Sequence, residues 1–198
     1  MLIVDCEASG LDPAANSLLS IGAVSLEAEP RIFYGECRIF DDASIMPATI
    51  AITGFSEQAM RDPAKKSPGQ LLSEFIEWMR PCNDITLAGQ NVYFDRDFLI
   101  ATSKKSGVAF DFGYRILDLH TLCWTHMTRR GIEPPARERK SSLSLDGILG
   151  YCGVPPEPKP HLAINGAKLA AECFSRILYG KPALPDYSKY PLPDYLLK

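Results

Sequence analysis

The chain has 198 residues, a net charge of −3, 46% hydrophobic residues and 23% charged residues. These values fit one domain with a full hydrophobic core, and they exclude a disordered or fibrous protein. The slightly negative charge excludes broad electrostatic attraction to nucleic acid, so nucleic-acid binding would need a local site. The apolar runs are too short to cross a bilayer and no signal peptide is recognisable, so we expect no membrane association.

The cysteine pattern argues against a zinc site or a disulfide framework. The six cysteines are scattered, and none forms a CxxC pair. We therefore expect free, mostly buried thiols and a cytoplasmic location, where thiols stay reduced.

The predicted elements begin with three strands and continue with strands that alternate with helices. Apolar runs predict strands at 2–6, 18–26, 32–39, 85–91 and 115–119. Helical spacing and capping signals predict helices at 70–80, 95–105, 119–127, 142–151 and 162–178. The short turn EAEP between the second and third strands indicates an antiparallel hairpin. This order predicts an α/β fold: a mixed five-stranded sheet with helices on both faces.

Two segments fall outside these elements. Residues 129–142 are rich in Arg and Lys, which favours a solvated loop, with a contact to a substrate backbone as the sharper alternative. The segment 181–198 is rich in Pro and Tyr and cannot form a regular helix. We therefore divide the chain into a domain at 1–180 and a C-terminal tail at 181–198.

Acidic residues gather at the ends of predicted strands. Asp5 and Glu7 lie two apart in DCEASGLD, so strand alternation points both side chains to one face. Two such carboxylates repel each other unless a proton or a hard divalent ion intervenes, although a D-x-E pair alone is more often surface charge. Asp95 opens a predicted helix in GQNVYFDRDF, where a capping role is the simpler interpretation. Asp118 is interpreted as structural.

Three histidines have different settings. His161 follows PPEPKP at the mouth of a helix, where a surface or capping role is the simpler reading of a lone histidine. His120 and His126 lie six apart on one predicted helix and are interpreted as structural.

Taken together, these motifs resemble the DEDDh 3′–5′ exonucleases, a branch of the ribonuclease H-like superfamily that includes RNase T and proofreading exonucleases. DCEASGLD matches the first motif, GQNVYFDRDFL the second, and the segment that starts at His161 the third; SIGAV, AITGFSEQAM and LSLDGILGYCGV also match. Each motif is weak alone, but their order and spacing are specific.

The resemblance implies a ribonuclease H-like fold and a role for each matched residue. Asp5, Glu7 and Asp95 would hold two Mg²⁺ or Mn²⁺ ions, and His161 would be the general base. Residues near the terminal nucleotide would be Ser9, Gly10, Leu11, Asn91 and Phe94.

Position 166 departs from the family pattern. The family has a fourth acidic ligand five residues after the histidine, and this chain has Gly166. Three explanations stay open: a natural site with an impaired reaction, a deliberate replacement, or compensation by another acid such as Asp97 or Glu172. We rank the last lowest, because both acids lie on other helical faces. Gly166→Asp is expected to raise Mn²⁺-dependent hydrolysis.

The sequence therefore predicts a metal-dependent exonuclease that acts on single-stranded 3′ ends of DNA or RNA by a two-metal mechanism. The alternative is a non-catalytic module that binds nucleic acid or protein on the same fold. The choice between DNA and RNA, the biological pathway and the oligomeric state stay open, with a homodimer among the possibilities because several relatives dimerise.

Overall fold

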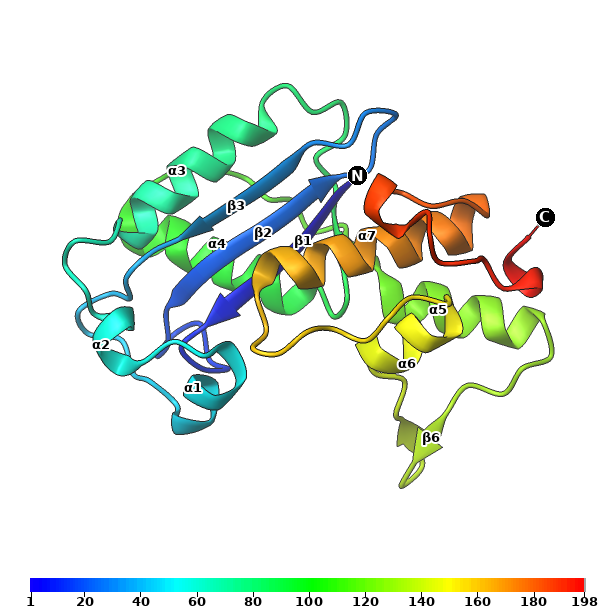
Figure 1. The fold of residues 1–198 in the computed structure, drawn as a ribbon. Helices are drawn as coiled ribbons and strands as arrows, with labels where there is room; N and C mark the ends of the chain where they lie inside the picture. Colours follow the sequence, from blue (N-terminus) through cyan, green and yellow to red (C-terminus); the bar gives the residue numbers. More distant parts are fainter. Residues whose placement is uncertain (198) are drawn as a thin grey trace.

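The computed structural model describes residues 1–197. Its centre is a mixed five-stranded sheet in the order β3-β2-β1-β4-β5 (Figure 1). The bounds are Leu2–Ala8 for β1, Leu18–Ser25 for β2, Ile32–Glu36 for β3, Leu87–Gly89 for β4 and Leu117–Asp118 for β5. The first three strands are antiparallel, whereas β4 and β5 run parallel to β1. The predicted α/β class and the predicted hairpin are confirmed.

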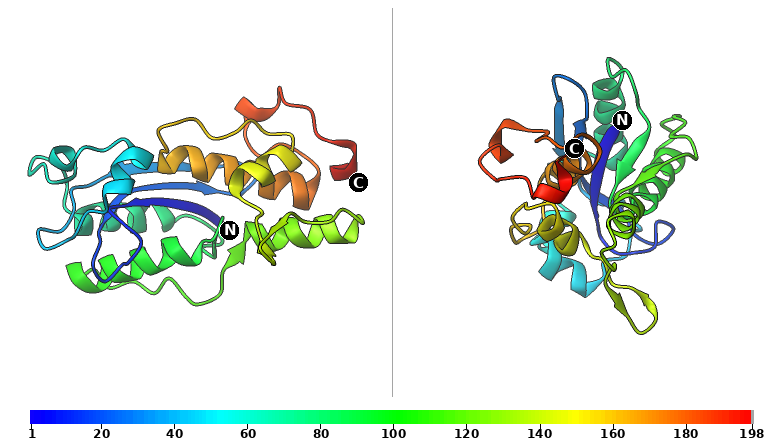
Figure 2. Two further views of the ribbon diagram at one scale, coloured as in Figure 1. Left: turned by 90° about the horizontal axis from the view of Figure 1, so that it is seen from below. Right: turned by 90° about the vertical axis from the view of Figure 1, so that its right-hand side faces the viewer.

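Helices cover both faces of this sheet. The helices are α1 (Pro47–Thr53), α2 (Glu57–Met60), α3 (Pro68–Met79), α4 (Tyr93–Ser106), α5 (Leu119–Arg129), α6 (Leu145–Tyr151) and α7 (Ala163–Tyr179). Figure 2 shows α7 on one face and α3 with α4 on the other. Strand alternation explains the two cores, since Leu2 and Val4 pack toward α3 and α4 while Ile3 packs toward α7.

A glycine allows α7 to approach the sheet closely. A side chain at Gly22 on β2 would overlap the backbone of Ala163, the first residue of α7. The lack of a Cβ therefore brings the start of α7 against the strands, next to the end of β1.

The structure differs from the sequence-based expectation mainly at short elements and at element ends. The third strand ends at Glu36 instead of residue 39, and the short helices α1 and α2 were not among the predicted elements. The charged segment 129–142 contains a small hairpin of β6 (Ala136–Arg137) and β7 (Lys140–Ser141). These elements are short, so their hydrophobic periodicity is too weak to detect in a sequence.

The C-terminal tail is packed onto α7 as far as the structure describes it. It forms two single-turn 3₁₀ helices, Pro185–Tyr187 and Asp194–Leu196, and buries Leu184 and Leu196. The predicted tail ends at Lys198, which lies outside the described residues.

Two sequence-based expectations concern the cysteines and membranes. The six cysteines are free thiols, and all except Cys82 are buried, as expected. Within residues 1–197, no helix has the length and apolar character needed to span a bilayer.

Candidate active site

The first two acids lie at the carboxyl end of β1. Asp5 and Glu7 alternate with Cys6, which packs into the core on the side of α3 and α4. Both carboxylates therefore point to the face covered by α7, as the D-x-E spacing predicts. The pairing of β1 with β2 shifts register between Glu7 and Ala8, and such irregularities are common beside active sites.

Asp95 comes from the first turn of α4 and does not cap that helix. Val92 is the N-cap residue, and the Asp95 carboxylate instead accepts a 2.7 Å hydrogen bond from the backbone N–H of Cys6. The side chain is only 3% exposed. The simpler interpretation of Asp95 as a helix cap is therefore wrong, and the bond to Cys6 ties the second motif to the strand that carries the first.

His161 comes from the loop before α7. Its backbone N–H donates to the carbonyl of Ile52 in α1 at 3.0 Å, which ties this loop to α1. Its Nδ1 lies 3.0 Å from a carboxylate oxygen of Glu157, and its side chain is 37% exposed. This contact with Glu157 engages Nδ1 and so orients the ring.

These four residues line one pocket of about 490 Å³. The other lining residues are Cys6, Leu11, Gln90, Asn91, Tyr93, Phe94, Ser144, Leu145, Asp146 and Glu157. Segments that are more than sixty residues apart in the chain thus meet at the end of β1.

The pocket concentrates negative charge, and no lysine or arginine is among the residues that line it. Burial raises the pKa of Asp5 well above its usual value, and the neighbouring Asp95, Glu7 and Glu157 raise it further. Burial, followed by repulsion from Glu157, raises the pKa of Glu7 to about 7. The pKa of Asp95 is also raised by burial, against the opposing effect of the Cys6 hydrogen bond. A positive ligand would relieve this repulsion.

Gly166 lies directly against Asp5. A Cβ at position 166 would be 2.5 Å from Oδ2 of Asp5 and 2.7 Å from its Cγ. Asp5 therefore occupies the space that a side chain at 166 would need. An aspartate at this position would require the Asp5 carboxylate to move.

The donor set has the chemistry of a hard divalent-cation site. It consists of carboxylate oxygens, and Oε1 of Glu157 is buried with no hydrogen-bond partner among residues 1–197. No three His, Cys, Asp or Glu side chains in that part of the chain are yet spaced to hold one ion. Ion binding would therefore need the carboxylates to reorient.

The residues that the resemblance places at the terminal nucleotide fall into two groups. Leu11, Asn91 and Phe94 line the pocket, and Leu11 is 72% exposed. Ser9 is fully buried, where its hydroxyl donates to the Ser44 carbonyl at 2.7 Å. A side chain at Gly10 would overlap Asn16. Ser9 and Gly10 thus do not line the pocket, and they support the loop that carries Leu11.

The two acids considered as substitutes for the missing ligand lie elsewhere. Asp97 forms an ion pair with Arg96 at 2.9 Å, and Glu172 forms a buried ion pair with Arg176 at 2.7 Å. Neither lines the pocket. Asp118 caps α5 through the N–H of Thr121, and His120 and His126 bind Ser141 and Tyr151, as their structural interpretation predicted.

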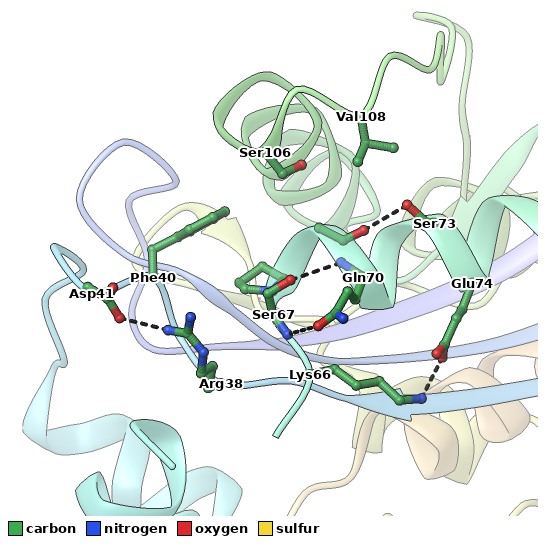
Figure 3. Close-up of a pocket in the computed structure, with 12 residues that line it drawn as sticks. Arg38, Phe40, Asp41, Lys66, Ser67, Gln70, Ser73, Glu74, Ser106 and Val108 are labelled. Carbon is green, nitrogen blue, oxygen red and sulfur yellow. Dashed lines mark hydrogen bonds and ion pairs between the residues drawn. The ribbon is translucent and has the colours of Figure 1, made fainter. Parts of the chain in front are cut away.

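A larger groove of about 850 Å³ lies between α3, the end of α4 and the segment after β3 (Figure 3). Its cations are already neutralised, because Arg38 pairs with Asp41 and Lys66 pairs with Glu74. No unpaired acid, base or nucleophile converges there among the residues that line it. The smaller acidic pocket is therefore the candidate active site.

A family model described as exonuclease, the RNase T family, matches residues 2–174. The chain belongs to this exonuclease family. The PolC-type DNA polymerase III of Thermotoga maritima is 25% identical over 177 residues, which are 89% of this chain and 12% of the polymerase. The corresponding protein of Thermotoga petrophila is 26% identical over the same shares. The exonuclease chain thus spans about an eighth of the length of these curated relatives.

Solved structures share the exonuclease fold. The nuclease domain of 3′hExo, a DEDDh family member bound to rAMP, has a TM-score of 0.69 and 19% identity, over 92% of this chain and 93% of that one. Escherichia coli exonuclease I with a dT13 oligonucleotide has a TM-score of 0.68 and 21% identity, over 94% and 42%. These similarities confirm the ribonuclease H-like fold.

Sequence reasoning missed Glu157 and Asp146, which both line the pocket of this exonuclease domain. Asp146 lies in the first turn of α6, where an acid normally stabilises the helix. Glu157 lies in an irregular loop, where no periodicity reports the direction of a side chain. Its one signal in the sequence is its position four residues before His161.

Proposed function

We propose that the chain is a metal-dependent 3′–5′ exonuclease domain that removes nucleotides from single-stranded 3′ ends. The observation that carries the proposal is the convergence of Asp5, Glu7, Asp95 and His161 on one pocket. Membership of the exonuclease family supports the hydrolytic class. We assign the catalytic unit to residues 1–180, with 181–198 as a tail.

The acids would hold two divalent ions, with Mg²⁺ or Mn²⁺ as the candidates. When bound, such ions supply an activated water and stabilise the charge on the leaving 3′ oxygen. One carboxylate oxygen of Asp95 accepts from Cys6, and the other would be available to a cation in the pocket that Asp95 lines. Binding of cations would restore the ionised state of the acids whose pKa values are raised.

His161 would act as the general base. Its Nδ1 is engaged by Glu157, so Nε2 is the nitrogen that would accept a proton from the attacking water. The pairing with Glu157 would stabilise the imidazolium that forms.

Apolar and aromatic side chains at the rim would hold the terminal nucleotide. Leu11, Tyr93 and Phe94 line the pocket, and Leu11 and Tyr93 are exposed to solvent. Stacking on such side chains tolerates any base, which suits an enzyme that degrades sequences without preference. The polar edge formed by Asn91 and Gln90 offers hydrogen bonds to the sugar.

The test is digestion of single-stranded DNA and RNA labelled at the 5′ end, with Mg²⁺, with Mn²⁺ or with EDTA. The expected result is a ladder that shortens from the 3′ end and needs metal, and that Asp5→Asn and His161→Asn abolish. Hydrolysis that survives both substitutions would place the reaction outside this pocket.

A non-catalytic binding module is the second candidate. Two observations favour it: the glycine at 166, and the lack of a metal-ready trio of side chains among residues 1–197. This candidate predicts that the chain binds a single-stranded oligonucleotide tightly but does not shorten it when metal is added.

A further inference from the structure

We propose that Glu157 supplies the acidic oxygen that position 166 lacks, as a ligand of the metal site and as the partner of His161. The inference rests on the proposed function, because it assigns a further ligand to the same site. Nothing in the family motifs points to this residue. It comes from the PPEPKP loop and not from α7.

Burial and hydrogen bonding set Glu157 apart from an ordinary surface acid. Its side chain is only 6% exposed, and it lines the same pocket as Asp5, Glu7 and Asp95. One oxygen, Oε2, lies 3.0 Å from Nδ1 of His161. The other, Oε1, is buried and has no hydrogen-bond partner among residues 1–197. A buried carboxylate oxygen without a donor is costly, which indicates that a ligand completes it.

Electrostatic coupling places Glu157 among the acids on β1. Its charge raises the pKa of Glu7 and contributes to the raised pKa of Asp5. The geometry agrees with this coupling, because Glu157 lines the same pocket as Asp5 and Glu7 and its Oε1 is buried there without a partner among residues 1–197.

The packing around Gly166 is consistent with a role of Glu157 in place of an acid at position 166. With no side chain at 166, Asp5 lies where that side chain would be. Compared with the family pattern, the site lacks the acid at position 166 on α7 but contains Glu157 from the preceding loop. With Glu157 as a ligand, the proposed metal site still has four carboxylates: those of Asp5, Glu7, Asp95 and Glu157. A glycine at 166 is therefore compatible with an intact site.

The direct test is Mn²⁺ binding to the full chain, measured by isothermal titration calorimetry and by electron paramagnetic resonance of free Mn²⁺. Glu157→Gln keeps the shape of the side chain and removes its charge. The expected result is affinity at least about ten-fold weaker, a loss of about 1.4 kcal/mol. Glu133→Gln is the matched control, because Glu133 is exposed and lies outside the pocket. It should bind Mn²⁺ as the parent does.

Asp5→Asn separates failure of this inference from failure of the proposed function. If Asp5→Asn weakens Mn²⁺ binding but Glu157→Gln does not, the metal site stands and the role of Glu157 is overturned. If neither substitution changes binding, both proposals fail. Circular dichroism of each variant checks the fold, and Glu157→Asp, which keeps the charge, serves as a second variant with an expected intermediate affinity.

The His161→Asn background separates metal binding from positioning of the histidine. A ligand role predicts that Glu157→Gln weakens Mn²⁺ binding in this background too. If the effect of Glu157→Gln vanishes when His161 is replaced, Glu157 is only a positioning residue and the inference is wrong.

Gly166→Asp provides an independent arm. The sequence alone leads to the expectation that this change raises activity, whereas the pocket leads to the opposite expectation. Asp5 fills the space and Glu157 already supplies the charge, so Gly166→Asp should leave Mn²⁺-dependent hydrolysis unchanged or lower it. A large gain in hydrolysis would show that Glu157 does not replace the acid at position 166, and it would overturn the inference.

Discussion

Two regions of this molecule bury acidic side chains. In one region the charge is paired with an arginine, and in the other several carboxylates lie together. On α7, Glu172 accepts from Nε of Arg176 at 2.7 Å and from the backbone N–H of Ala183 at 2.8 Å. Arg176 in turn donates to backbone carbonyls of the preceding loop and the tail, which include those of Cys152, Pro191 and Tyr190. Both side chains are fully buried and fully paired.

The acidic pocket lacks such compensation. Asp5, Glu7, Asp95 and Glu157 share one pocket, where the polar partners are the N–H of Cys6 and the ring of His161. A paired buried charge fixes the structure around it, whereas an unpaired set destabilises the free protein until a ligand binds. The first region holds the C-terminal tail in place, and the second is the cation site that we propose.

The largest expected effect on stability comes from removing the buried ion pair between Glu172 and Arg176. Arg176→Met would leave the charge of Glu172 buried without its cation, and it would remove the hydrogen bonds from Arg176 that hold the tail. We expect the free energy of unfolding to fall by about 3–5 kcal/mol, measured by urea denaturation. The matched control is Arg129→Met at an exposed site on α5, which should stay within about 0.5 kcal/mol of the parent. Equal stability of the two variants would contradict the structural role of the ion pair.

Metal binding in the acidic pocket should raise the free energy of unfolding. Mn²⁺ at about one hundred times its dissociation constant should raise the free energy of unfolding by about 2.7 kcal/mol, because the ion binds only the folded state. Thermal unfolding with and without EDTA measures the effect. Asp5→Asn should remove the Mn²⁺ response, and a response that persists in this variant would place the ion elsewhere.

The metal-free pocket should also make stability depend on pH. The pKa of Glu7 is raised to about 7 from an unfolded value of 4.5, so the folded state holds its proton more tightly. This contribution is fully present below about pH 4.5 and is lost as the pH rises through about 7. Glu7→Gln should therefore stabilise the metal-free protein at pH 8 by about 2 kcal/mol. Thermal unfolding in EDTA between pH 5 and pH 8 is the measurement, and a stability that rises with pH in this range would contradict the charge arrangement.

The smallest expected effect concerns the charged hairpin of β6 and β7. Arg137 and Arg139 are exposed on this hairpin, near α6, whose first residues line the pocket. Replacing both with Gln should weaken binding of a single-stranded oligonucleotide several-fold and reduce the salt dependence of binding. Fluorescence anisotropy at several salt concentrations measures this. An unchanged salt slope would favour the solvated-loop interpretation of the segment.

Much of this architecture could be predicted from the amino-acid sequence, because it depends on local patterns. Apolar runs located the five strands, and strand alternation correctly placed Asp5 and Glu7 on one face. The serine cap of α6 and the hairpin between β2 and β3 follow from short-range capping and turn chemistry. The order and spacing of the motifs also indicated the exonuclease family.

Tertiary structure alone decided which acids meet. The contact of Asp5 with position 166, the burial of Glu157 and the pairing of Glu172 with Arg176 depend on how α7 and its preceding loop pack on the sheet. An irregular loop has no period from which the direction of its side chains could be read, and burial depends on residues far away in the chain. For this reason the sequence suggested an incomplete site at Gly166, while the packing brings the carboxylate of Glu157 to the pocket that Asp5, Glu7 and Asp95 line.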